Sequence, residues 1–202
     1  MDFSLTDEQR ALSELAGQIL SDRGALDRLK AIEASPDGYD REAWSELAKA
    51  GLLGAALPEA FGGSGGGFLE LCLLLEQQGK RVVQLPLVAT LAAAALPLVR
   101  FGSEEQKKRL LPGVARGETI LTAALSEPGG DERKPSATAK AIDGGFRLTG
   151  VKTGVPWAKA AAAMLVPAKT EGGVAVFLVD PKAPGVVLAP QGTMSWERCC
   201  RV

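Results

Sequence analysis

The residues best placed to do chemistry lie in one stretch in the middle of the chain. Residues 120–125 form an apolar run, followed by Ser126, Glu127 and the loop formers Pro128, Gly129 and Gly130. An apolar run bounded by turn formers is typical of a buried strand. Glycines also let a backbone approach a ligand closely, because no Cβ intervenes. A strand that ends in such a loop, where two domains meet, predicts a cofactor site.

Composition excludes several kinds of catalytic site. The chain has no histidine, which removes the commonest general base, every histidine-based triad and histidine zinc sites. Its cysteines, Cys72, Cys199 and Cys200, show no metal-ligand spacing, and no Gly-x-Ser-x-Gly elbow is present. We therefore predict no metal site, and we assign no catalytic residue within this chain.

The bulk properties predict a globular protein. Of 202 residues, 46% are hydrophobic, which is ample for a core. Basic residues are scattered, the net charge is −1 and aromatic residues are few, so we expect no nucleic-acid partner. Three cysteines make no disulfide framework, and the start, with Asp2 and Asp7, does not read as a signal peptide, so we expect a cytoplasmic protein. Residues 85–99 are too short to span a membrane and contain Pro86 and Pro97.

The elements before the central stretch are predicted to be helices. Thr6 with Gln9, and Ser103 with Gln106, have the spacing of capping boxes. Further helices are expected over residues 23–32, after Asp40, over residues 68–79 and over residues 91–101. The repeated helical period predicts an antiparallel helical bundle.

After the central stretch the period changes to that of short strands. Strands are expected at residues 136–142, 146–149, 151–155, 161–166, 174–179 and 186–188, and residues 198–202 could begin another. Their number and spacing predict a partial antiparallel β-barrel or sandwich. The expected class is thus α+β, with a helical domain over residues 1–117 and an incomplete β-domain over residues 118–202. The last strands lack partners, from which we expect a truncated or fragmentary chain.

Five motifs, in order along the chain, resemble those of the acyl-CoA dehydrogenase family. They are Asp2-Phe3-Ser4-Leu5-Thr6; Trp44, Leu47, Ala48, Gly51, Leu52, Pro58, Glu59, Gly62, Gly63 and Gly65; Gly102-Ser103-Glu104-Glu105-Gln106-Lys107 with Leu110-Leu111-Pro112; Ala124-Leu125-Ser126-Glu127-Pro128-Gly129; and Leu148-Thr149-Gly150-Val151-Lys152. Each motif is weak alone, whereas five in the family's order make the resemblance specific.

The resemblance implies a flavin reaction. Family members dehydrogenate an acyl-CoA thioester: a glutamate takes the α-proton, and FAD accepts hydride from the β-carbon. That glutamate lies in a C-terminal helical domain, and no position here matches it, so we expect this chain alone to be inactive. The family also implies electron-transfer flavoprotein as electron acceptor and a homo- or hetero-oligomer, dimer or tetramer.

The resemblance also implies which residues meet the cofactor. These are Ala123, Leu125 and Ser126 on the strand, Gly129 and Gly130 in the loop, and Gly154, Val155 and Pro156 in place of the family's W-I-T/S strand.

Two departures from the family pattern affect this site. The family's serine after the loop glycines is missing, and Glu132 near a pyrophosphate would be electrostatically unfavourable. The family's flavin-facing tryptophan is also missing, and we expect Trp157 to be a core or rim aromatic instead. Glu127 is expected to be structural and Lys152 a solvated charge.

Three functions are compatible with these observations. The first is an FAD-dependent acyl-CoA dehydrogenase whose base lies outside this chain. The second is the non-catalytic partner subunit of a heteromeric acyl-CoA dehydrogenase. The third is a flavin oxidase or monooxygenase on the same architecture, because a fold alone does not fix a function.

Overall fold

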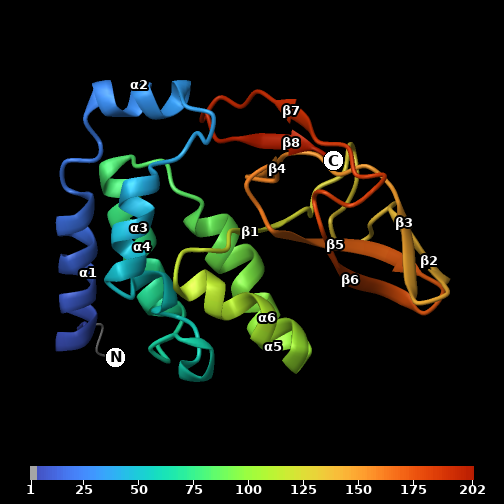
Figure 1. Ribbon diagram of the computed structural model, residues 1–202, viewed down its shortest axis with the longest axis horizontal. Helices are drawn as coiled ribbons and strands as arrows, with labels where there is room; N and C mark the ends of the chain where they lie inside the picture. The colour runs from blue at the N-terminus through green and yellow to red at the C-terminus, as the bar shows by residue number, and fades with distance from the viewer. Residues whose placement is uncertain (1–3) are drawn as a thin grey trace. The chain divides into compact units, whose positions relative to one another are not determined.

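A run of helices is followed by a run of strands (Figure 1). The computed structural model describes residues 4–202, so Asp2 and Phe3 of the first motif lie outside the described residues. Contacts divide the chain into two compact units, one ending at Ile120 and the other beginning at Leu121. The predicted helix-then-sheet class is confirmed.

The first unit is helical, with short 3₁₀ and π segments between the α-helices. The elements are α1 (Asp7–Leu20), α2 (Leu26–Ala34), α3 (Arg41–Lys49), η1 (Leu52–Gly54), η2 (Glu59–Phe61), α4 (Phe68–Arg81), the π-helix η3 (Val88–Ala95), α5 (Leu96–Phe101) and α6 (Glu104–Ala115). The helix expected over residues 23–32 begins only at Leu26, because Gly24 lies in the preceding turn and Ala25 is extended. The helix expected over residues 91–101 begins earlier, at Val88, as a π-helix.

Local capping starts several of these helices as the sequence predicts. At α1, the Gln9 N–H donates to Thr6 Oγ1 at 3.2 Å, and the Thr6 N–H donates to Gln9 Oε1 at 3.0 Å. Ser103 and Gln106 make the same reciprocal pair at α6. Each box satisfies two backbone N–H groups that a helix start leaves unpaired.

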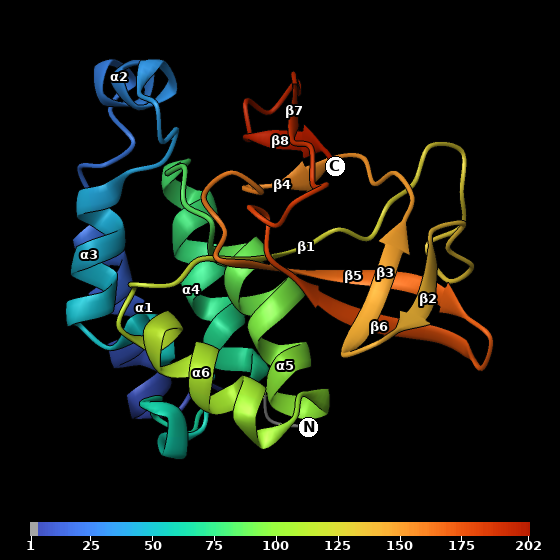
Figure 2. The ribbon, with the colours of Figure 1, turned by 45° about the vertical axis from the view of Figure 1, so that its right-hand side comes forward.

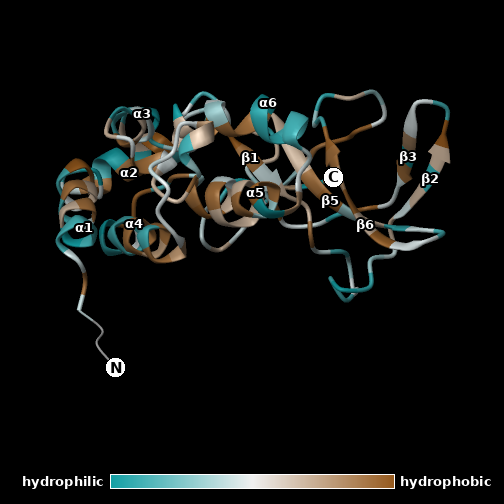
Figure 3. Ribbon diagram, turned by 90° about the horizontal axis from the view of Figure 1, so that it is seen from below, coloured by the Kyte–Doolittle hydropathy of each residue, from teal (hydrophilic) through white to brown (hydrophobic). Residues whose placement is uncertain are grey.

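The core of the first unit is leucine-rich. Its fully buried large side chains include Leu47, Leu53, Leu71, Leu74, Leu87, Leu111 and Val114. Helix α6 begins with a polar run, seen in teal in Figure 3, and ends with buried residues. Trp44 is buried on α3, and its Nε1 donates to the Gly117 carbonyl at 2.8 Å, which ties α3 to the segment after α6.

The second unit contains two sheets. The larger has the order β1 (Leu121–Ala123), β5 (Ala163–Thr170), β2 (Thr138–Ile142) and β3 (Gly145–Thr149), with β6 (Gly173–Val179) also paired to β5. The smaller has the order β4 (Val155–Pro156), β8 (Cys199–Arg201) and β7 (Ala189–Gln191). The long β5–β6 pair is clearest in Figure 2.

The predicted β-domain is present, but its sheets are not closed into a barrel and its pairing is not purely antiparallel. Both sheets are open, and β1 and β2 each pair with β5 in parallel. Parallel neighbours come from segments far apart in the chain, which a reading of consecutive hairpins cannot detect.

Strand limits also differ from expectation. Of the strand expected at residues 151–155, only Val155 is in a strand, as the first residue of β4, because Lys152 and Thr153 pair outside the ladders. The strand expected at residues 186–188 begins later, at Ala189, while the strand near the end of the chain is present as β8. Within the described residues, no helix is long and apolar enough to cross a membrane.

Candidate functional site

The structure brings together the two segments that the sequence singles out. Strand β1 runs parallel to β5, and the Ala124 N–H donates to the Leu165 carbonyl at 2.8 Å, so the chain stays beside β5 beyond the strand. The Thr153 N–H donates to the Ser126 carbonyl at 2.9 Å, and Thr122 Oγ1 donates to the Pro156 carbonyl at 2.6 Å. The loop after β1 therefore lies against the residues that lead into β4.

The predicted residues of the first segment differ in exposure. Ala123 is buried, whereas Leu125 is 41% exposed and Ser126 is partly buried. Gly129 has a φ of 67°, a left-handed conformation that favours glycine, and the Gly130 N–H donates to the Glu127 carbonyl at 3.2 Å. Both glycines are exposed in this turn.

The Ser126 hydroxyl, which the resemblance directs toward a flavin, is occupied within the chain. It donates to the Glu132 carboxylate from the same loop. A serine hydroxyl carries one proton, so this bond uses its whole donor capacity. The sequence marks Glu132 as unfavourable for a pyrophosphate but gives no sign of this contact.

The second predicted segment is also paired internally. The Gly154 N–H donates to Gln191 Oε1 at 2.7 Å, and Gln191 Nε2 donates to Thr153 Oγ1 at 3.0 Å. Val155 is buried in the core of the unit, and Pro156 has no N–H to donate. Gln191 comes from β7, far along the chain, so no local pattern could reveal its role.

Glu127 and Lys152 form a buried ion pair, so the prediction of a solvated Lys152 is wrong. Lys152 Nζ donates to Glu127 Oε1 at 2.8 Å, and the two side chains are only 4% and 7% exposed, respectively. Glu127 also accepts the Ser136 N–H at 2.6 Å and the Ala137 N–H at 3.0 Å. The carboxylate thus joins the loop after β1, the start of β2 and the segment before β4.

This environment keeps Glu127 ionised. Burial acts to raise the pKa of Glu127, but the hydrogen bonds from Lys152, Ala137 and Ser136, with the lysine charge, outweigh it and lower the pKa to about 2. A carboxylate paired in this way is a poor general base, because it takes up a proton only in strong acid.

Trp157 and Cys199 are likewise structural. Trp157 is 3% exposed, as expected of a core aromatic, and its Nε1 donates to Glu197 Oε1 at 3.2 Å. Trp157 and the exposed Trp196 both have positive φ, at 57° and 60°.

The Cys199 thiol is not an activated nucleophile. Burial, with the nearby Glu197 charge, raises the pKa of the Cys199 thiol to about 11, so this thiol stays protonated and is a weak nucleophile.

Two of the polar groups that the resemblance directs toward FAD already have partners within this chain. The Ser126 hydroxyl and the Gly154 N–H, two polar groups expected to meet it, are bound by Glu132 and Gln191. The Glu132 carboxylate also places negative charge beside the loop that would hold a pyrophosphate. Flavin contact by the predicted residues therefore stays a prediction.

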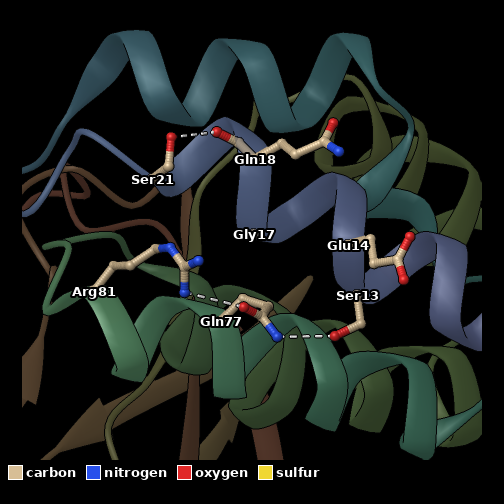
Figure 4. A pocket seen from close by; sticks show the side chains of 7 residues that line it. All are labelled: Ser13, Glu14, Gly17, Gln18, Ser21, Gln77 and Arg81. Carbon is tan, nitrogen blue, oxygen red and sulfur yellow. Dashed lines mark hydrogen bonds between the residues drawn. The ribbon is translucent and has the colours of Figure 1, made fainter.

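The structure also contains surface cavities elsewhere. One, of about 480 Å³, lies between α1 and α4 and is lined by Ser13, Glu14, Gly17, Gln18, Ser21, Gln77 and Arg81 (Figure 4). There the Arg81 guanidinium donates to Gln77, whose amide donates to Ser13 at 2.8 Å. Another, of about 710 Å³, is lined by residues of β2, β3, the end of β5 and the β5–β6 turn. Neither cavity contains a residue of the predicted cofactor site.

Comparison with protein families gives one match over more than half of the chain. The family model described as "Acyl-CoA dehydrogenase, N-terminal domain" matches residues 6–118. Among curated proteins, Acyl-CoA dehydrogenase FadE27 of Mycobacterium tuberculosis (strain ATCC 25618 / H37Rv) is 35% identical over 193 residues. The aligned region covers 96% of this chain and 51% of FadE27.

Two solved structures share both the fold and the sequence pattern. A variant of the Tcur3481-Tcur3483 steroid ACAD is 44% identical with a TM-score of 0.92, and covers 96% of this chain and 54% of that one. The ChsE4-ChsE5 complex from Mycobacterium tuberculosis is 33% identical with a TM-score of 0.92, and covers 100% of this chain and 54% of that one. The chain spans about half the length of each protein that it matches here.

Proposed function

This chain belongs to the acyl-CoA dehydrogenase family, and on that premise we propose that it is one subunit of an FAD-dependent enzyme that dehydrogenates a CoA thioester. The reaction class removes one hydrogen from each of two adjacent carbons, and FAD supplies the electron acceptor. Electron-transfer flavoprotein is the proposed final acceptor, and the cytoplasm the proposed location.

We propose that this subunit contributes structure while another subunit or segment contributes the base. The observation that carries this proposal is the pairing of Glu127, the acidic residue of the site motif, which is bound by Lys152 and two backbone N–H groups. Its pKa of about 2 leaves the carboxylate ionised, so it does not act as a general base near neutral pH. The thiol of Cys199 is protonated, and the chain has no histidine.

A hetero-oligomer is the assembly that this proposal favours. One similar structure is a complex of two named proteins, ChsE4 and ChsE5. This likeness supports a partner subunit without identifying the partner.

The proposal is tested by co-expressing the protein with a homologous family member from the same source. We expect a stable complex that carries flavin, and bleaching of the oxidised flavin bands when an acyl-CoA is added without nicotinamide cofactor. The 202-residue chain purified alone should give no turnover with an artificial electron acceptor. Turnover by that chain would contradict the structural role, and flavin reoxidation only with oxygen insertion into substrate would instead indicate a monooxygenase.

A further inference from the structure

We propose that Glu132 and Gln191 close this chain's own flavin-facing surface, so that this subunit does not itself hold the isoalloxazine ring. The inference rests on the proposed function, since it concerns which subunit of the enzyme binds FAD. It adds an assignment for two residues that the family motifs do not include.

The first part of the closure is the Ser126–Glu132 contact. The Ser126 hydroxyl donates its only proton to the Glu132 carboxylate and has none left for a flavin carbonyl. Hydrogen bonds to a charged acceptor are stronger than those to a neutral one, so a neutral flavin oxygen competes poorly. The same carboxylate would repel the FAD diphosphate as it approaches.

The loop structure holds Glu132 in this position. Glu127, before the turn, accepts the N–H groups of Ser136 and Ala137, after it, so the two ends of the loop are tied together. Within the loop, the Lys134 N–H donates to the Asp131 carbonyl at 2.8 Å. Glu132 therefore lies in a loop that is held by hydrogen bonds both at its two ends and within it. These bonds favour one position of Glu132 beside Ser126.

Gln191 supplies the second part of the closure. It reaches from β7 to the Gly154 N–H at 2.7 Å and to the Thr153 hydroxyl at 3.0 Å. The next two residues offer no replacement donor, because Val155 is buried and Pro156 lacks an N–H. The two polar groups expected to contact a flavin ring, the Ser126 hydroxyl and the Gly154 N–H, are thus hydrogen-bonded to side chains of the same chain.

Removing the two side chains should open the surface. We would compare Glu132→Ala, Gln191→Ala and the double variant with the unchanged protein, using FAD as the probe and quenching of its fluorescence as the readout. We expect little binding by the unchanged protein and at least roughly tenfold tighter binding by the double variant, because the Ser126 hydroxyl and the Gly154 N–H would then be available to the flavin. Glu171→Ala is the matched control, because it removes an exposed acidic residue of the same unit without opening the site.

The outcomes separate this inference from the proposed function. One tightly bound FAD per unchanged chain would overturn the closure and leave the proposed enzyme intact. Equal FAD binding by the unchanged protein, the control and the double variant, with thermal unfolding showing all of them folded, would also overturn it. Tighter binding by the double variant alone would support it, even if no flavin-bearing partner were found.

Discussion

At the scale of single residues, the Glu127–Lys152 ion pair links three segments of the β unit. Both side chains are almost fully buried, and the carboxylate is shared among three segments. The sequence correctly predicts a structural Glu127. It does not predict the burial of Lys152, because the partner that neutralises this lysine is remote in sequence and is brought close only by the fold.

Removing the Lys152 side chain should leave the Glu127 carboxylate buried without its positively charged partner. We expect Lys152→Ala to lower the free energy of unfolding by about 3 kcal/mol or more, because an unpaired buried carboxylate loses its compensation. Urea unfolding followed by circular dichroism measures this change. Lys169→Ala, which removes an exposed lysine of the same unit, should change stability by less than about 0.5 kcal/mol. Equal effects of both substitutions would contradict the buried pairing.

The same pair predicts a pH dependence. The pKa of Glu127 falls from an ordinary value of 4.5 to about 2 on folding, so between these values the unfolded chain binds more protons. The stabilisation is therefore complete above about pH 5 and is lost as the pH falls toward 2, by about 3 kcal/mol in total. Unfolding measured between pH 2 and 7 should show the unchanged protein and Glu127→Gln converging in acid. A constant difference between them would refute this.

At the scale of elements, the packing of β2 against the end of β3 depends on Gly150. A Cβ at Gly150 would lie 2.5 Å from the Ala137 Cβ and 2.8 Å from its Cα. We expect Gly150→Ala to lower the free energy of unfolding by about 2 kcal/mol through overpacking. Gly145→Ala is the control, since a Cβ there would meet nothing within 4 Å.

A second substitution checks the cause of that effect. Adding Ala137→Gly to Gly150→Ala should recover part of the lost stability, because it removes the closest atom of the clash. Thermal or urea unfolding of the double variant measures the recovery. Strictly additive losses would point to backbone conformation at Gly150 in place of steric contact.

Elements specified by local sequence could be predicted, and elements specified by remote pairing could not. The capping pairs Thr6–Gln9 and Ser103–Gln106 lie three residues apart, so their spacing is visible in the sequence. The parallel pairing of Leu121 with Ala163 joins segments 42 residues apart and follows no local pattern. For the same reason the sequence indicates Ser126 and Gly154 as candidates but not the Gln191 side chain that binds near them.

At the scale of the whole molecule, each compact unit has its own core and its own buried tryptophan. Trp44 lies in the core of the helical unit and Trp157 in that of the β unit, while the third, Trp196, is exposed. Because the chain has only these three tryptophans, two double variants, Trp157→Phe/Trp196→Phe and Trp44→Phe/Trp196→Phe, each leave one buried indole.

The placement of these indoles gives the protein two built-in spectroscopic reporters. Emission from Trp44 alone should follow the melting of the helices, and emission from Trp157 alone that of the sheets. In a denaturant titration, Lys152→Ala should shift the red-shift midpoint reported by Trp157 and leave that of Trp44 nearly in place. Matching shifts at both indoles would mean that helices and sheets melt as one cooperative body.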